Sequence, residues 1–341
     1  MMGKVVCFGE IMGRLNPPGY LKVVQAHSFE LSFAGGEANV AVSVANFGAK
    51  ASFVTKLPKN DLAKNALRIL KGYDVDVSDI VYGGERLGMY YVEKGASQRP
   101  SKIIYDRKYS SISTASGTDF DWEKIFADAD WFHFTGITPA LSDELARICS
   151  DACTEAKKRG IFISCDLNYR KNLWSPEKAG KVMGGLMPFV DLIIANEEDA
   201  DMVFGIKASH TDVTSASLSH AGYEDVAAQL CRRFGSDYVA ITLRGSISAS
   251  DNRWSGMLYS DGQSNFSREY NIHIVDRVGG GDSFAGALIF ALHEKYEPKM
   301  AIEFAAAASC LKHAIEFDFN QVTVSDVETL LDGDGSGRVQ R

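Results

Sequence analysis

The sequence lacks the features that mark several large classes of protein. It has no run of lysine or arginine long enough to follow a phosphate backbone, and its formal net charge is −8, so nucleic acid is not an expected partner. No apolar stretch is long enough to span a bilayer, and residues 1–15 lack the apolar core and cleavage site of a signal peptide. We therefore expect a cytoplasmic protein that acts on a small molecule and not on a membrane.

Paired cysteines and two common phosphate-binding motifs are also missing. The six cysteines are scattered and form no C-x-x-C pair, which is typical of reduced thiols in a reducing compartment. The sequence has no G-x-x-x-x-G-K-[ST] motif, and its glycine run at residues 279–281 does not have the G-x-G-x-x-G spacing. Neither a P-loop nor a dinucleotide-binding fingerprint is therefore supported.

What the 341 residues do contain is a regular alternation of apolar strands and helical segments. Continuous apolar strands that alternate with helices are typical of a parallel sheet covered on both faces. We predict an α/β fold, a three-layer α/β/α sandwich with a mainly parallel central sheet. Strands are expected within residues 4–10, 51–57, 131–137, 161–168, 191–199 and 238–245, and helices at 36–47, 61–71, 141–158, 176–187 and 223–234.

Two segments interrupt this alternation and predict a lid. Residues 11–33 and 86–110 alternate aromatic and polar residues without an intervening helix, so we expect a small antiparallel β-sheet that projects from the core and covers a site. Its exposed edge or face favours a homodimer or a larger homo-oligomer. The expected division is a core of residues 1–10, 34–85 and 111–330, the lid, and a disordered Gly-rich tail at 331–341.

The segment "DRVGGGDSFAGAL" places three glycines between two aspartates at the start of an apolar helix. Backbone N–H groups of consecutive glycines at a helix N-terminus suit an anion, above all phosphate. Asp282 would repel a phosphate unless it accepts a proton from an attacking hydroxyl. The alternative is that Asp282 caps the helix and the glycines form a tight turn. Both interpretations stay open on this segment alone.

Together with "FAGGEANVAVSVANFGA" at residues 33–49, this segment resembles the two signature regions of the ribokinase-like (PfkB) carbohydrate kinases. The resemblance implies ATP and Mg²⁺ as cofactors, Asp282 as general base, and an anion hole for the γ-phosphate formed by Gly279, Gly280 and Gly281. Arg277 and Val278 stand where the family usually has threonine. This departure puts in doubt a monovalent-cation site that uses a hydroxyl there.

The same resemblance extends to the nucleotide and the metal. "ANEED" resembles the family's N-x-x-E element, with Asn196 matching and Asp199 expected to contact Mg²⁺ through water; helix capping is the alternative. "ITLRGSIS" resembles a nucleotide-binding strand and loop. The residues expected to bind ATP are Asn196, Thr242, Arg244, Gly245, Gly279 and Gly281.

Within the family, the sequence is most similar to 2-keto-3-deoxygluconate kinases. Arginines bind carboxylates through paired hydrogen bonds, and tyrosines offer a ring face and a hydroxyl to a sugar. The residues expected to bind substrate are Gly35, Gly36, Asn39, Tyr90, Tyr105, Arg107, Arg170 and Asp282. The resemblance implies ATP-dependent phosphorylation of the C6 hydroxyl of this sugar acid. A fructokinase- or ribokinase-like kinase of neutral sugars, and a non-catalytic sugar-binding regulator, remain the alternatives.

Overall fold

The computed structural model describes residues 3–196, 198–207 and 220–333. Its centre is a nine-stranded sheet in the order β14-β13-β12-β11-β10-β9-β1-β4, with β15 also paired to β13. The strands are β1 (Lys4–Phe8), β4 (Ala51–Val54), β9 (Ala129–Thr135), β10 (Phe162–Asp166), β11 (Leu192–Ala195), β12 (Tyr238–Ser246), β13 (Asp251–Ser260), β14 (Gln263–Phe266) and β15 (Tyr270–His273).

Neighbouring strands from β4 to β12 pair in parallel, whereas β13 pairs antiparallel with β12, β14 and β15. Side chains of β1 alternate between two separate cores: Val5 and Cys7 pack on one face of the sheet, and Val6 and Phe8 pack on the other. A strand that is buried on both faces has no polar side, which explains its continuous apolar sequence. The predicted α/β fold with a mainly parallel central sheet is confirmed.

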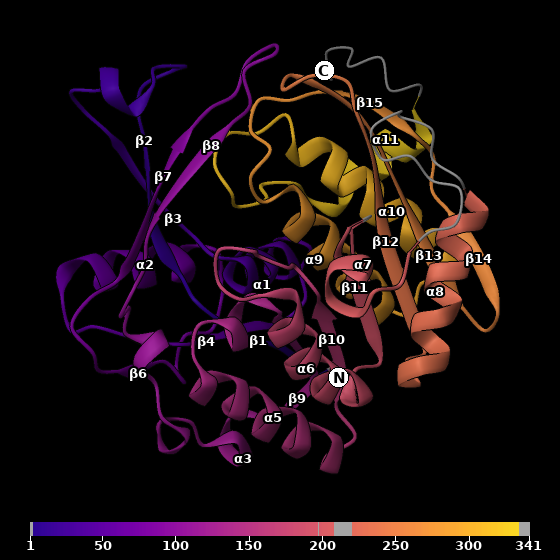
Figure 1. Ribbon diagram of the computed structural model, residues 1–341, viewed down its shortest axis with the longest axis horizontal. Coiled ribbons are helices and arrows are strands. Elements are labelled where there is room, and N and C mark those ends of the chain that lie inside the picture. The colour runs from indigo at the N-terminus through magenta and orange to yellow at the C-terminus, as the bar shows by residue number, and fades with distance from the viewer. Residues whose placement is uncertain (1–2, 197, 208–219, 334–341) are drawn as a thin grey trace.

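Helices cover both faces of this sheet (Figure 1). One core includes side chains of α1 (Gly36–Asn46), α2 (Asp61–Gly72), α9 (Gly280–His293), α10 (Pro298–Lys312) and α11 (Val324–Asp332). The other includes α3 (Trp122–Ile125), α4 (Ile137–Ala140), α5 (Asp143–Lys158), α6 (Pro176–Leu186), α7 (Asp199–Phe204) and α8 (His220–Phe234).

The sequence of α5 shows why these helices form where they do. Ser142 caps the helix by accepting a hydrogen bond from the backbone N–H of Leu145, at 3.1 Å. Buried residues then recur every three or four positions from Leu145 to Ala156 and form one apolar stripe. Local sequence therefore determines both the start of the helix and the face that it buries.

A second sheet projects from the core as an arm (Figure 1). Its order is β3-β2-β7-β8, from β3 (Glu30–Ala34), β2 (Met12–Asn16), β7 (Gly88–Glu93) and β8 (Lys102–Asp106). We call these four strands the lid. The expectation that the lid is antiparallel throughout is wrong, because β2 pairs with β7 in parallel. The chain passes through α1 and α2 between these two strands, and so no hairpin forces them to be antiparallel.

Three further features complete the fold. β5 (Lys56–Leu57) and β6 (Val81–Tyr82) form a short two-stranded sheet. Leu331 and Asp332 of the predicted tail belong to α11, and residues 334–341 lie outside the described residues. Over the part of the chain that the structure describes, no helix has the length and apolar character needed to cross a membrane.

Candidate active site

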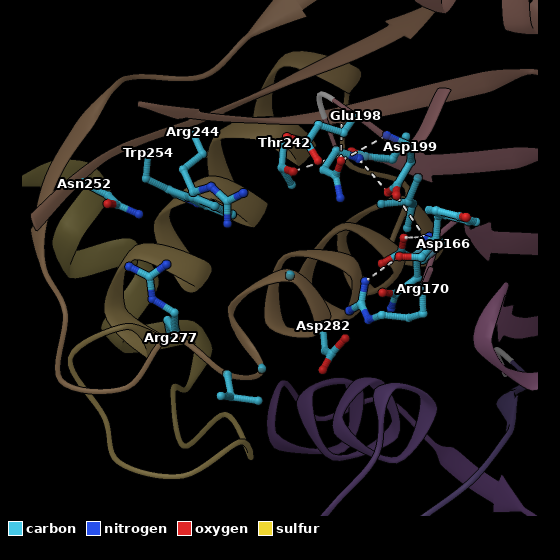
Figure 2. A pocket seen from close by; sticks show the side chains of 18 of the residues that line it. Asp166, Arg170, Glu198, Asp199, Thr242, Arg244, Asn252, Trp254, Arg277 and Asp282 are labelled. Atoms are coloured by element: carbon cyan, nitrogen blue, oxygen red, sulfur yellow. Dashed lines mark hydrogen bonds between the residues drawn. The ribbon is translucent and has the colours of Figure 1, made fainter. Parts of the chain in front are cut away.

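A cavity of about 490 Å³ lies where the parallel strands end at their carboxyl edge, the usual place for a ligand in an open α/β sheet. Asp166 at the end of β10, Ala195 at the end of β11 and Thr242 within β12 line one wall. The turn before α9 contributes Gly279, Gly281 and Asp282. In Figure 2, Asp282 lies on the side of this space opposite Thr242.

The turn at residue 279 requires glycine for two reasons. Gly279 has φ +82°, a left-handed conformation that other residues rarely adopt, and it precedes the first residue of α9. A Cβ atom at this position would also lie 2.3 Å from the backbone oxygen of Asp318. Backbone N–H groups in the first turn of a helix lack acceptors within that helix. The N–H of Gly280 donates to the backbone oxygen of Arg277 at 3.3 Å, whereas Gly279, Gly281 and Asp282 line the cavity.

The carboxylate of Asp282 lies at the boundary between this cavity and a smaller one. Its Oδ2 accepts a hydrogen bond of 2.6 Å from Nδ2 of Asn39 on α1. Burial raises the pKa of Asp282 to about 6, against the opposing effect of the Asn39 hydrogen bond. A carboxyl group with this pKa is ionised at neutral pH, yet it is basic enough to accept a proton.

The smaller cavity, of about 80 Å³, brings together residues that are far apart in the sequence. The lid contributes Tyr90, whose ring centroid lies 6.1 Å from that of Tyr105. All the residues expected to bind substrate line it: Gly35, Gly36, Asn39, Tyr90, Tyr105, Arg107, Arg170 and Asp282. Ile103, Asn168, Arg170, Val278 and Asp282 line both cavities, so the two spaces meet at the carboxylate of Asp282.

Arg107 does not stand alone in the small cavity. One of its terminal nitrogens donates to the carboxylate of Glu10, and the guanidinium lies 5.6 Å from the ring centroid of Tyr105. Ser110 donates to the other oxygen of Glu10 at 2.5 Å. Glu10 is buried, and therefore it holds the guanidinium in one position and offsets part of its charge. The sequence analysis did not identify Glu10.

Beyond the small cavity, a wider groove of about 1040 Å³ opens between the lid and residues 169–176. Tyr105, Arg107 and Arg170 line this groove as well. Arg170 is exposed and donates to the backbone oxygen of Tyr169 at 3.0 Å. The three side chains that the sequence selected for binding an acid therefore stand at the entrance to the site.

Besides Gly279 and Gly281, four of the residues expected to bind ATP or metal line the larger cavity: Asn196, Asp199, Thr242 and Arg244. The carboxylate of Asp199 is buried and accepts from the backbone N–H groups of Tyr169 at 3.0 Å and Asn196 at 3.2 Å. Among the described residues, no group of three or more His, Cys, Asp or Glu side chains is placed to hold a metal ion. In the described part of the chain, Gly245 and Gly280 do not line these cavities.

The structure also adds side chains that the sequence analysis missed. Arg277, Trp254 and Asn252 lie on the same side of the larger cavity as Arg244 (Figure 2). Burial and the neighbouring Arg244 lower the pKa of Arg277. Two guanidinium groups on one wall favour an anionic ligand. No local pattern marks this group, because its members come from separate strands and a turn.

His313 lines the larger cavity near the N-terminus of α9. Its ring packs over the backbone of Gly280, where a Cβ atom would lie 2.5 Å away, and its centroid lies 4.9 Å from that of Trp254. Burial lowers the pKa of His313 to about 4, so the ring is neutral at pH 7. It therefore adds a neutral aromatic surface to the cavity wall.

Comparison with known proteins agrees with this geometry. The family model described as "pfkB family carbohydrate kinase" matches residues 2–313. A 2-dehydro-3-deoxygalactonokinase of Haloferax volcanii is 33% identical over 337 residues, which is 99% of each chain. A 2-dehydro-3-deoxygluconokinase of Thermoproteus tenax is 28% identical over 93% of this chain and 90% of its own. The crystal structure of a 2-dehydro-3-deoxygluconokinase from Thermotoga maritima is 49% identical, has a TM-score of 0.94, and covers 98% of this chain and 100% of its own.

Proposed function

This chain belongs to the pfkB family of carbohydrate kinases, and on that premise we propose that it transfers the γ-phosphoryl group of ATP to the C6 hydroxyl of 2-keto-3-deoxygluconate. The relatives named above, which act on 2-dehydro-3-deoxy sugar acids, support this choice of substrate. The observation that carries the proposal is the carboxylate of Asp282, which stands where the two cavities meet.

In this proposal the sugar acid occupies the small cavity, with its terminal hydroxyl beside Asp282. Asp282 accepts the hydroxyl proton as the oxygen attacks the γ-phosphorus, the bond to the β-phosphate oxygen breaks, and ADP leaves. Backbone N–H groups of Gly279, Gly281 and Asp282, which line the larger cavity, stabilise the negative charge on the transferring group. The lid excludes water, which limits hydrolysis of ATP.

ATP would occupy the larger cavity. Thr242, Arg244 and Arg277 stand on its walls and provide a hydroxyl and two guanidinium groups for the nucleotide. Mg²⁺, when bound, would neutralise phosphate charge, a role for which carboxylate oxygens are suitable partners. The carboxylate of Asp199 already accepts two backbone hydrogen bonds, and so it fits contact with the ion through water.

The choice of a sugar acid over a neutral sugar rests on two arginines. Arg107 and Arg170 both line the small cavity, whereas a neutral hexose has no carboxylate to pair with them. Glu10 offsets part of the charge of Arg107, and the carboxylates of Asp166 and Asp282 interact with the charge of Arg170. A kinase of neutral sugars would instead use both arginines as hydrogen-bond donors to hydroxyls.

An assay of ADP release tests the proposal against a panel of 2-keto-3-deoxygluconate, its galactonate epimer, fructose and ribose. We expect kcat/KM for the two keto acids to exceed that for the neutral sugars by about 10- to 150-fold, since one charge-assisted pair contributes about 1.5–3 kcal/mol. Turnover of fructose or ribose at an equal kcat/KM would instead identify a neutral-sugar kinase. No ADP release with any member of the panel would support the non-catalytic regulator.

Substitution of Arg107 and Arg170 tests whether they recognise the carboxylate of the substrate. We expect Arg107→Ala or Arg170→Ala to raise KM for the keto acid by about 10- to 100-fold while KM for fructose changes little. Arg86→Ala is the matched control, because Arg86 lies just before lid strand β7, donates to the backbone oxygen of Asp106 at 2.8 Å and lines neither cavity. Equal effects on both substrates would mean that no carboxylate is recognised.

We further propose that the protein is a cytoplasmic homodimer that associates through the lid. Apolar side chains of the lid that do not line the cavities are partly exposed, among them Leu31 and Ile104 at 38–39%. All six cysteines are free, as expected of a reducing compartment. Light scattering after size exclusion measures the mass, and Ile104→Lys should convert the dimer to a monomer.

A further inference from the structure

Lys312 is a fully buried lysine that the proposed mechanism does not use. It is the last residue of α10, and its relative exposure is 0%. Its ammonium group donates to the backbone oxygen of Val278 at 2.6 Å and to that of Asp276 at 3.3 Å. Both oxygens belong to the turn that leads into Gly279 and the start of α9. Burial of an ammonium group costs free energy unless acidic or polar groups pair with it, so the groups around Lys312 must offset this cost.

The surroundings of Lys312 are dominated by acidic groups. The charged groups that face it are Asp276, Asp318, Asp282 and Arg14. Burial lowers the pKa of Lys312, and the three carboxylates oppose that effect.

Arg14 of lid strand β2 is also completely buried and bridges two of these acids. It contacts Asp276 at 2.5 Å and is hydrogen-bonded to Asp318, which also accepts from the hydroxyl of Tyr90 at 3.0 Å. The single positive charge of Arg14 is therefore paired with the negative charges of two carboxylates. Lys312 is the second cation of the cluster, and Asp282 is its third carboxylate.

We propose that Lys312 is a positioning residue. Its ammonium group holds the 276–279 turn in place and balances the negative charge beside Asp282. This inference rests on the proposed role of Asp282 as base. Without the ammonium, the remaining carboxylates would repel the charge on Asp282, and the two backbone oxygens would lose their donor. The protonated, inactive form of Asp282 would then be favoured at higher pH.

The pH dependence of kcat gives the decisive measurement. The groups that act on Asp282 are Asp318, which raises its pKa, and Arg170 and Lys312, which lower it; Asp166 at the end of β10 also interacts with Asp282. We expect Lys312→Met to move the acid limb of the kcat profile upward by about one pH unit, because removal of a nearby positive charge favours the neutral carboxyl group. At pH 6 this shift lowers kcat about fivefold, while KM for the sugar changes less than about threefold.

Lys4→Met is the matched control. Lys4 is likewise a buried lysine, but it pairs with Asp128 at 3.0 Å, close to the start of β1 and away from the cavities. It should lower stability and leave the acid limb in place. An unmoved limb in Lys312→Met, or an equal shift in Lys4→Met, overturns the inference.

Two further variants keep the inference testable. If Lys312→Met does not fold, Asp318→Asn should move the acid limb downward, because it removes a negative charge that raises the pKa of Asp282; no downward shift then overturns the inference. Asp282→Asn separates the two proposals. If that variant keeps its kcat, the proposed function fails, whereas an inactive Asp282→Asn with an unmoved limb in Lys312→Met refutes the role of Lys312 alone.

Discussion

Asp282→Asn should make the protein more stable while it removes almost all activity. Burial raises the pKa of Asp282 from 3.8 to about 6, so the folded protein binds this proton more tightly than the unfolded chain does. The free energy of unfolding therefore falls as the pH rises from about 4 to about 6, and it stays lowered above pH 6. Asparagine is a neutral residue of similar shape and carries no such penalty.

The structure sets the size of this effect. A shift of about two pKa units corresponds to about 3 kcal/mol at 1.36 kcal/mol per unit. The substitution also weakens the 2.6 Å hydrogen bond from Asn39, at a cost of about 1 kcal/mol. Above pH 6 we therefore expect Asp282→Asn to raise the free energy of unfolding by about 1–3 kcal/mol, with no gain near pH 4.

Urea unfolding at pH 4.5 and pH 8 measures the difference in stability, and ADP release measures kcat. Loss of a positioned base lowers kcat by about 10²–10⁴-fold. Asp151→Asn is the control, since Asp151 is an exposed carboxylate that pairs with Arg147 at 2.8 Å, and its effect on stability should be small. A stability gain that is the same at both pH values, or none at pH 8, would refute the account of a buried, destabilised carboxylate.

Two further substitutions test residues that hold the candidate site in its conformation. Arg14→Met removes the guanidinium that pairs with both Asp276 and Asp318 in the interior, and we expect a loss of about 3–5 kcal/mol in thermal or urea unfolding; an unchanged transition would contradict the buried pairing. Gly279→Ala forces a Cβ atom against the backbone oxygen of Asp318 at a left-handed position, and it should lower kcat at least about tenfold and stability by about 1–3 kcal/mol. Gly281→Ala is its control for stability, because a Cβ atom there meets open space.

Much of the fold could be predicted because its signals are local. The apolar segment at residues 4–8 forms a strand buried on both faces, and the cap and spacing of residues 142–156 form a helix with one apolar stripe. The lid was predicted as a separate sheet for the same reason. The parallel pairing of β2 with β7 was not, since it depends on the path of the chain through α1 and α2 between them.

The candidate site divides in a similar way. Asp282 and its glycines could be found because they are adjacent in the sequence and resemble a known motif. Glu10 could not, because its significance lies in its contact with Arg107, 97 positions away. Arg277 and Trp254 likewise join one wall only when the strands and the turn that carry them are assembled.

The sequence by itself determined the strands, the helices and the glycine turn that opens α9, because backbone conformation and apolar periodicity depend on neighbours a few residues apart. Only the tertiary structure decided which charges are buried and what they face. Arg14 and Lys312 look like ordinary surface residues in the sequence, yet both are fully buried beside Asp276 and Asp318. The energy of a buried charge depends on its distance to every other charge and on the exclusion of water, and both quantities exist only once the chain has folded.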